Sequence, residues 1–281
     1  MIVKVENLVK RYKELIALDH FNMEIREGEI LGLLGPNGCG KTTAINCILS
    51  LLKFDKGNIR IFGKEMRPDS YDIKRNIGVV PQEVAVFENL NVKDNIDYFC
   101  GLYIDDKKLR EEYVNEAIQF VGLKDYVGFY PRKLSGGLKR RLNIACGIVH
   151  KPKLIFLDEP TVAVDAQSRN FILEGIKKLN REGSTILYTT HYLEEAEMLC
   201  NRIVIMDRGK SLVSGSNEEL KAMISTREKI IVGFQEDSPS LKNKIENIEH
   251  VIEVDKQEGD YIIKFENGLN NISNLLDFIK N

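Results

Sequence analysis

The most constraining feature of this 281-residue chain is a glycine-rich segment that fits the pattern G-x-x-x-x-G-K-[ST]. An apolar run at 29–34 before it predicts a buried strand, and helical spacing of apolar residues at 43–49 predicts a helix after it. Glycines let successive backbone N–H groups turn toward an anion, and the helix N-terminus adds partial positive charge. This context predicts a phosphate-binding loop, whereas a chance glycine-rich turn would need neither the strand nor the helix. The loop comprises Gly35, Pro36, Asn37, Gly38, Cys39, Gly40, Lys41, Thr42 and Thr43.

Composition and charge exclude several classes of protein. Charged residues make up 29% of the chain, hydrophobic ones 43%, and the net charge is −2 without a basic block, so we expect a soluble globular protein with no direct nucleic-acid partner. No apolar run approaches the roughly 20 residues that cross a bilayer, and residues 1–6 lack the apolar core of a signal peptide. Five scattered cysteines without a C-x-x-C pair indicate the reducing cytoplasm. Cys39 could be a reactive thiol or simply a small residue that fits the loop.

The order of the predicted elements indicates an α/β fold. Residues 2–9 and 15–25 alternate between apolar and polar positions, as half-exposed antiparallel strands do. Strands that alternate with helices predict a mostly parallel sheet with right-handed crossovers. Further strands are predicted at 57–63, 77–80, 153–158, 184–191 and 202–207, the last ending in a tight turn, and helices at 91–102, 107–121, 136–150 and 171–181, with Asn91 and Asp106 as N-caps.

Four chemical groups follow predicted strands and should therefore meet at one edge of the sheet. In open α/β sheets, ligands bind at the carboxyl ends of the strands. There Lys41 should contact the β- and γ-phosphates of a nucleotide, and Thr42 should hold Mg²⁺. The groups that follow strands are Gly35 of the loop, Gln82, the pair Asp158 and Glu159, and His191.

Each of these side chains suits one part of nucleotide hydrolysis, although each alone could be an ordinary turn residue. Asp158 suits Mg²⁺, directly or through water, and Glu159 suits the general base that polarises the attacking water. Gln82 could ligate Mg²⁺ or hold the water, and His191 could hydrogen-bond the γ-phosphate. Tyr12 could stack on a base or simply pack in a turn.

A second glycine pair lies just inside a predicted helix, in the sequence Leu134-Ser135-Gly136-Gly137. Glycine costs about 1 kcal/mol relative to alanine in a helix interior. Some group must therefore approach this helix N-terminus closely, and an anion is the natural candidate.

These segments, in this order and spacing, resemble the ATP-binding cassette (ABC) family over residues 1 to about 215. The resemblance implies a P-loop NTPase of the ABC ATPase type, with a mostly parallel core sheet, an antiparallel β subdomain and a helical subdomain at about 88–150. It also implies that two copies dimerise head to tail, each ATP being clamped between one phosphate loop and Ser135, Gly136 and Gly137 of the other copy. Tyr12 then matches the adenine-stacking aromatic residue, Gln82 the metal-sensing loop and His191 the switch histidine.

Two positions depart from the usual family pattern. Leu138 stands where glutamine is common, and the continuation Leu-Lys-Arg-Arg is similar to the drug- and antibiotic-export branch. Ala163 stands where glycine is usual, so a positive φ there would be strained. Asp165, in the same loop, is expected to communicate across the dimer.

Residues 216–281 should form a small C-terminal α+β appendage. Strands are predicted at 228–235, 251–256 and 260–266, and helices at 239–249 and 269–280. Similar tails occur in export-branch cassettes and could help to hold the dimer.

The resemblance implies the ATP-hydrolysing subunit of a transporter, most simply an exporter, with a separate transmembrane permease as its partner. Such a subunit would be cytoplasmic and peripheral on the inner face of the cell membrane, and residues 83–90 are the expected contact with the permease. Two alternatives stay open: a soluble ABC-type ATPase that acts on DNA or ribosomes, and a nucleotide-gated regulator. The absence of heptads between Lys41 and Asp158 and the single cassette disfavour the first, and Glu159 disfavours the second.

Overall fold

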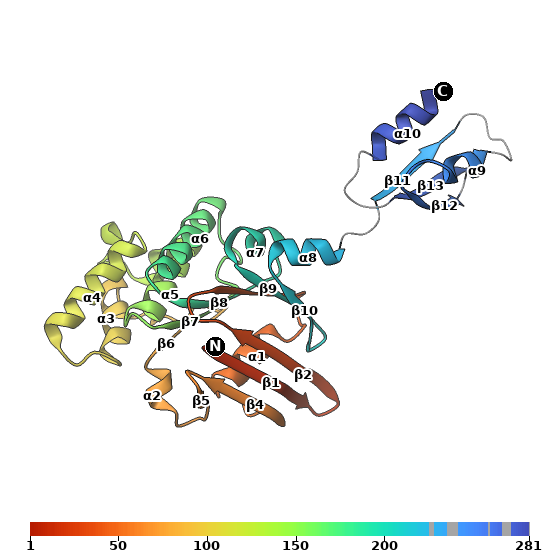
Figure 1. The fold of residues 1–281 in the computed structure, drawn as a ribbon. Helices are drawn as coiled ribbons and strands as arrows, with labels where there is room; N and C mark the ends of the chain where they lie inside the picture. The colour runs from red at the N-terminus through yellow and green to blue at the C-terminus, as the bar shows by residue number, and fades with distance from the viewer. Residues whose placement is uncertain (225–227, 235–240, 258, 266–270, 281) are drawn as a thin grey trace. The chain divides into compact units, whose positions relative to one another are not determined.

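The computed structural model describes residues 1–224, 228–234, 241–257, 259–265 and 271–280 (Figure 1). The chain forms two compact units, Met1–Asn217 and Glu218–Asn281. We expected the boundary at about residue 215.

The core of the first unit is a six-stranded sheet of order β10-β9-β3-β8-β7-β6. Five strands are parallel, and β10 pairs antiparallel with β9. The central strands β7 and β8 are buried along their whole length, as parallel strands covered on both faces are. The register pairs Asp158 with Thr189 and Leu34 with Thr190, so three strands end at the same edge. The strands are β3 (Ile30–Leu34), β6 (Ile77–Val80), β7 (Leu154–Asp158), β8 (Thr185–Thr190), β9 (Arg202–Asp207) and β10 (Lys210–Gly215).

A second, antiparallel sheet of order β2-β1-β4-β5 packs against this core. Its strands are β1 (Val3–Tyr12), β2 (Leu15–Ile25), β4 (Lys56–Ile61) and β5 (Lys64–Glu65). Helix α1 (Lys41–Ile48) contacts both β2 and β7, and its Ile45 and Ile48 join one apolar core with Phe21 of β2 and Phe156 of β7. The alternating pattern of the first 25 residues therefore puts one face of this sheet in the core.

Helices α3, α4 and α5 lie beside β6 at one end of the core sheet (Figure 1). Both predicted N-caps are confirmed: Asn91 accepts a hydrogen bond from the Asp94 N–H at 2.9 Å, and Asp106 accepts one from the Leu109 N–H at 2.8 Å. None of the helices in the described part of the chain is long and apolar enough to cross a membrane. The helices of this unit are α1, α2 (Tyr71–Lys74), α3 (Val92–Gly101), α4 (Lys107–Phe120), α5 (Gly136–Ile148), α6 (Ala166–Arg181) and α7 (Leu193–Leu199), with 3₁₀ turns at Lys124–Tyr126 and Pro131–Lys133.

Three helices of this unit differ from the expectation, among them α2, which has only four residues and no side-chain cap and was not predicted. Helix α6 begins at Ala166, five residues before the predicted start, because the Asp165 side chain caps it by accepting from the Ser168 N–H at 2.9 Å. Helix α7 was not predicted, since it has only seven residues and no side-chain cap.

The second unit is an α+β fold, as expected. Its antiparallel sheet has the order β11-β13-β12, and Ile245, Tyr261 and Phe265 belong to its core. Residues 235, 239–240, 266 and 269–270 of the predicted elements lie outside the described residues. The remaining elements are α8 (Asn217–Ile224), which was not predicted, β11 (Glu228–Gly233), α9 (Leu241–Glu246), β12 (Val251–Gln257), β13 (Asp260–Phe265) and α10 (Asn271–Lys280). The predicted α/β class is confirmed, with two sheets in the first unit and the small α+β appendage as the second unit.

Candidate functional site

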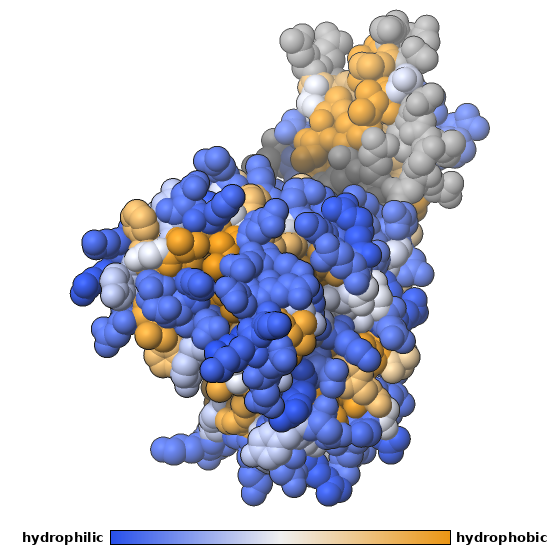
Figure 2. Space-filling model, turned by 90° about the vertical axis from the view of Figure 1, so that its left-hand side faces the viewer, coloured by the Kyte–Doolittle hydropathy of each residue, from blue (hydrophilic) through white to orange (hydrophobic). Residues whose placement is uncertain are grey.

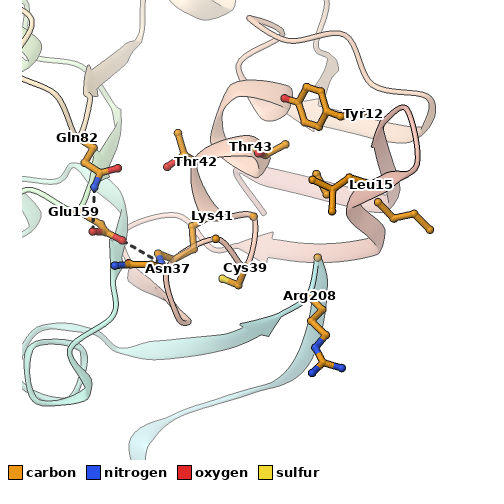
Figure 3. A pocket seen from close by; sticks show the side chains of 15 residues that line it. Tyr12, Leu15, Asn37, Cys39, Lys41, Thr42, Thr43, Gln82, Glu159 and Arg208 are labelled. Atoms are coloured by element: carbon orange, nitrogen blue, oxygen red, sulfur yellow. Dashed lines mark hydrogen bonds and ion pairs between the residues drawn. The ribbon is translucent and has the colours of Figure 1, made fainter.

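A cleft of about 720 Å³ opens where α1 begins, at the carboxyl edge of the core sheet. In Figure 3, Gln82 and Lys41 point toward Glu159, and Tyr12 and Leu15 lie across the cleft from them. The cleft is lined by Tyr12, Leu15, Ile16, Ala17, Asn37, Gly38, Cys39, Gly40, Lys41, Thr42, Thr43, Gln82, Glu159, Arg208 and Gly209.

The glycine-rich loop has the backbone that an anion site needs. Gly40 has a φ of 111°, and a β-carbon there would lie 2.7 Å from the Ala17 carbonyl oxygen, so only glycine fits. Gly40 is also the N-cap of α1 and provides no side-chain hydrogen bond, which leaves the first N–H groups of the helix open to a ligand.

Lys41 is buried at the bottom of the cleft. Its Nζ donates to the carbonyl oxygens of Gly35 at 2.8 Å and Pro36 at 3.2 Å, and it forms an ion pair with Glu159 Oε1 at 3.0 Å. A phosphate that enters the loop can replace the carboxylate as the anion beside this ammonium group. The Glu159 carboxylate would then be free to contact a group on the far side of the phosphate.

Asp158 and Thr42 form the second polar pair of the site. The Thr42 hydroxyl donates to Asp158 Oδ2 at 2.7 Å, and the Thr189 hydroxyl donates to Asp158 Oδ1 at 2.6 Å. Hydroxyl and carboxylate oxygens are ligands that suit Mg²⁺, which usually keeps several waters and phosphate oxygens as well. No group of three or more acidic, histidine or cysteine side chains in the described residues forms a metal cluster, so a cation here would rely on those further oxygens.

Glu159 occupies a constrained position directly after β7. Its φ is 46°, in the left-handed region that costs a non-glycine residue energy, and its backbone N–H donates to the Thr189 hydroxyl at 2.9 Å. Gln82 Nε2 donates to Glu159 Oε2 at 3.4 Å, and His191 Nδ1 lies 3.4 Å from the same oxygen. The structure therefore brings the ends of β6, β7 and β8 and the glycine-rich loop together around one carboxylate.

Sequence reasoning missed the side chains that hold these groups in place. Buried Arg140 of α5 donates to the carbonyl oxygens of Pro81 at 3.0 Å and Gln82 at 2.6 Å. Asn143, one turn later, accepts from the Ala85 N–H at 3.0 Å. Burial lowers the pKa of Arg140 from its ordinary value. An arginine and an asparagine on the buried side of an amphipathic helix are the sequence feature that could have indicated these contacts.

Tyr12 forms the other wall of the cleft with Leu15 and Ile16. Tyr12 is 45% exposed, and the Lys10 ammonium lies 4.8 Å from the centroid of its ring. An accessible aromatic ring flanked by aliphatic side chains is suited to stacking on a flat apolar group such as a nucleobase.

Ser135, Gly136 and Gly137 lie apart from this cleft and are not among the described residues that line it. Ser135 caps α5 by accepting from the Leu138 N–H at 3.3 Å. A β-carbon at Gly137 would collide with the Ser168 hydroxyl and lie 2.9 Å from Asp165 Oδ2, so packing within the chain requires this glycine. Our expectation that an approaching anion explains both glycines is thus corrected for Gly137. At Gly136 a β-carbon would have the Ala163 carbonyl oxygen, 3.9 Å away, as its nearest neighbour.

Cys39 is a buried, free thiol. Burial raises its pKa above the ordinary value, although Lys41 acts in the opposite direction. A raised pKa keeps the thiol protonated and unreactive at neutral pH, so the small-residue explanation is the better one.

The loop 161–165 contains a strained alanine. Ala163 has a φ of 59°, which is the left-handed conformation that we considered because glycine is usual at this position. The pKa of Asp165, at the end of the loop, is lowered, chiefly because its carboxylate accepts a hydrogen bond from the Ser168 backbone N–H.

Ala163→Gly is therefore expected to stabilise the protein. Relief of the left-handed strain outweighs the extra chain entropy of glycine by about 0.5–1 kcal/mol. The melting temperature of the first unit, measured by calorimetry, should rise by about 1–3 °C. Ala166→Gly, the same change at an exposed helical position, should lower it instead, and an equal loss in both variants would refute the strain at Ala163.

The chain is similar to known proteins in sequence and in fold. A family model described as ABC transporter matches residues 18–162. The chain is 39% identical over 219 residues to the linearmycin resistance ATP-binding protein LnrL of Bacillus subtilis, covering 78% of this chain and 70% of that protein. It is 36% identical over 224 residues to the daunorubicin/doxorubicin resistance ATP-binding protein DrrA of Streptomyces peucetius, covering 80% of this chain and 68% of that protein.

A solved structure has the same fold. The dimeric, post-hydrolysis structure of the ATP-binding cassette MJ0796 with bound ADP and Pi matches with a TM-score of 0.71 and 28% identity. The match covers 76% of this chain and 98% of that one.

Proposed function

This chain belongs to the ABC transporter family as an ATP-binding, ATP-hydrolysing subunit, and we propose that two copies clamp ATP and Mg²⁺ between them, head to tail, to power export through a separate membrane permease. One observation carries the proposal: Glu159 lies within 3.4 Å of Lys41, Gln82 and His191 at the edge of the sheet where a phosphate chain would end.

The roles of the cleft residues follow from their chemistry. Lys41 and the open N–H groups of α1 bind the β- and γ-phosphates, and Gly35 to Thr43 form the cradle. Thr42 and Asp158 hold Mg²⁺, which would neutralise charge on the phosphates, with Gln82 beside them. Glu159 takes the proton of the attacking water, and His191 donates a hydrogen bond to the γ-phosphate. Tyr12 stacks on adenine.

The dimer explains why Ser135 and Gly136 lie outside the chain's own cleft. A capped helix N-terminus with open space at Gly136 can receive an anion, yet no phosphate in this chain's cleft would reach it. A second copy related by a two-fold axis would bring its γ-phosphate to this helix. The dimeric arrangement of the MJ0796 cassette supports this reading. The second unit could add contacts that hold the dimer.

The segment 83–90 is our proposed contact with the permease. Its backbone is fixed by buried Asn95, which accepts from the Phe87 N–H at 2.8 Å and donates to the Phe87 carbonyl oxygen at 3.0 Å. Its side chains nevertheless remain accessible: Phe87 is 44% exposed and stacks edge-on with exposed Tyr98 at 4.8 Å between centroids. The face of the first unit that Figure 2 shows is mainly hydrophilic, with separate apolar patches. A rigid segment with an aromatic tip suits a short cytoplasmic helix of a membrane protein.

The proposals that this chain serves export and lies at the membrane rest on its relatives. LnrL is named for linearmycin resistance and DrrA for daunorubicin and doxorubicin resistance, which an exporter can provide, and we extend export to this chain. The protein would then be cytoplasmic and peripheral on the inner face of the membrane. A nucleotide-gated regulator is disfavoured, because it has no need of a carboxylate such as that of Glu159 beside the phosphates. A soluble ATPase that acts on DNA or ribosomes is disfavoured by the single cassette and by the absence of heptads between Lys41 and Asp158.

Ser135→Arg tests the shared site. The longer, charged side chain should block closure onto the other copy's phosphate, so ATP hydrolysis should fall at least tenfold while binding of ATP to the single chain stays within about twofold. Phosphate release and a fluorescent-nucleotide titration measure the two quantities. Ser273→Arg, which changes an exposed serine of α10 in the second unit, is the matched control, and equal hydrolysis by both variants would contradict the shared site.

A further inference from the structure

A buried carboxylate outside the cleft joins several parts of the site. Glu195 of α7 is 1% exposed. Its Oε2 accepts hydrogen bonds from the hydroxyls of Thr161 at 2.9 Å, Tyr188 at 2.6 Å and Thr190 at 2.9 Å. Its Oε1 forms an ion pair with Arg169 Nε at 2.7 Å. Four groups from three other segments therefore satisfy one buried charge.

Stability alone is a weak reason to keep such a charge. Removing a carboxylate from water is costly, and well-packed apolar side chains often replace a buried ion pair without loss of stability. A buried charge does, however, fix the relative position of every group that it binds, and it tolerates only one arrangement of them.

The segments that Glu195 joins are those next to the reacting groups. Thr161 is two residues beyond Glu159, and Thr190 directly precedes His191. The Thr190 hydroxyl also accepts from the Tyr192 N–H at 3.0 Å, so the backbone on both sides of His191 is fixed to this carboxylate.

Arg169 extends the connection to α5. It belongs to the first turn of α6, where neighbouring Ser168 packs against Gly137. Its guanidinium also lies 5.2 Å from the centroid of the Tyr192 ring, which in turn lies 4.0 Å from that of His191. A continuous chain of contacts thus runs from Gly137 through α6 to His191.

We propose that Glu195, with Arg169, is a positioning residue that couples the helix start at Ser135–Gly137 to His191 of the same chain. This inference rests on the proposed head-to-tail dimer. When Ser135 and Gly136 meet the other copy's nucleotide, a shift of the α5 start moves Gly137 against Ser168 at the start of α6. Arg169 and Glu195 then pass this shift to the backbone that carries His191. Each chain then hydrolyses its own ATP only after it has clamped its neighbour's, which makes the two sites cooperative.

Glu195→Gln tests this coupling. The amide keeps the shape and most hydrogen bonds but loses the charge that Arg169 pairs with. Binding of ATP to the single chain should stay within about twofold, kcat should fall about tenfold, and the Hill coefficient for ATP should fall from about 2 toward 1. Glu194→Gln, on the exposed side of the same helix, should leave all three unchanged.

Arg169 provides a second pair of variants in a side chain that is one-third exposed. Arg169→Lys should retain most of the cooperativity, whereas Arg169→Gln should lose it with normal folding. If the wild type is cooperative and both Glu195→Gln and Arg169→Gln match Glu194→Gln, the coupling is wrong although the dimer stands. If the wild type itself stays monomeric with a Hill coefficient of 1, the proposed function has failed instead.

Discussion

Glu159→Gln is expected to bind ATP as tightly as the wild type or more tightly, and to release phosphate about 10²–10⁴-fold more slowly. The amide cannot take a proton from water, so the chemical step loses its base. Lys41 at the same time loses the carboxylate that lies 3.0 Å from its Nζ, and a phosphate no longer competes with that ion pair. Phosphate release under saturating ATP and Mg²⁺, together with a nucleotide titration, measures both effects.

The control for this variant is Glu182→Gln, which changes an exposed glutamate at the C-terminal end of α6. It should hydrolyse ATP at the wild-type rate. If Glu159→Gln hydrolyses ATP within a factor of a few of that rate, Glu159 is not the base, and another group must activate the water.

Lys41→Ala is expected to weaken ATP binding itself. The ammonium group is a buried cation on the first residue of α1, whose first N–H groups are open. Each charge-assisted hydrogen bond to a phosphate contributes about 1.5–3 kcal/mol, or roughly ten- to 150-fold in the dissociation constant. The substitution also leaves the buried Glu159 carboxylate without its ion pair, so the melting temperature should fall. Calorimetric titration with ATP measures the first effect, and circular dichroism measures the second.

Lys53→Ala removes an exposed lysine that follows α1 and should leave both quantities unchanged. An unaltered dissociation constant for ATP in Lys41→Ala would contradict the phosphate role of this residue, whatever happened to the melting temperature.

Much of the fold and of the cleft could be predicted because the signals are local. The glycine-rich loop is set by adjacent residues, and the strand ends that carry Gln82, Asp158 and His191 follow from runs of apolar residues. Parallel strands put those ends at one edge, so the contacts within 3.4 Å of Glu159 follow from topology.

The supporting contacts could not be predicted, because each joins residues far apart in sequence. Thr189 and Arg140 look like ordinary strand and helix residues until their hydroxyl and guanidinium are seen holding Asp158 and Gln82. Gly137 shows the same limit. The sequence indicated a close approach at this glycine, but the approaching group is Ser168 of the same chain, which lies 31 residues later and is placed by the Asp165 cap.

Two copies of this chain are expected to enclose ATP between them. Light scattering on Glu159→Gln during gel filtration tests this expectation most directly, because slow hydrolysis keeps the clamped form intact. We expect the mass of one chain with ADP, twice that mass with ATP and Mg²⁺, and the mass of one chain again when Ser135→Arg is added to the same protein. The mass of a single chain at saturating ATP, or a doubling that Ser135→Arg does not prevent, would contradict it.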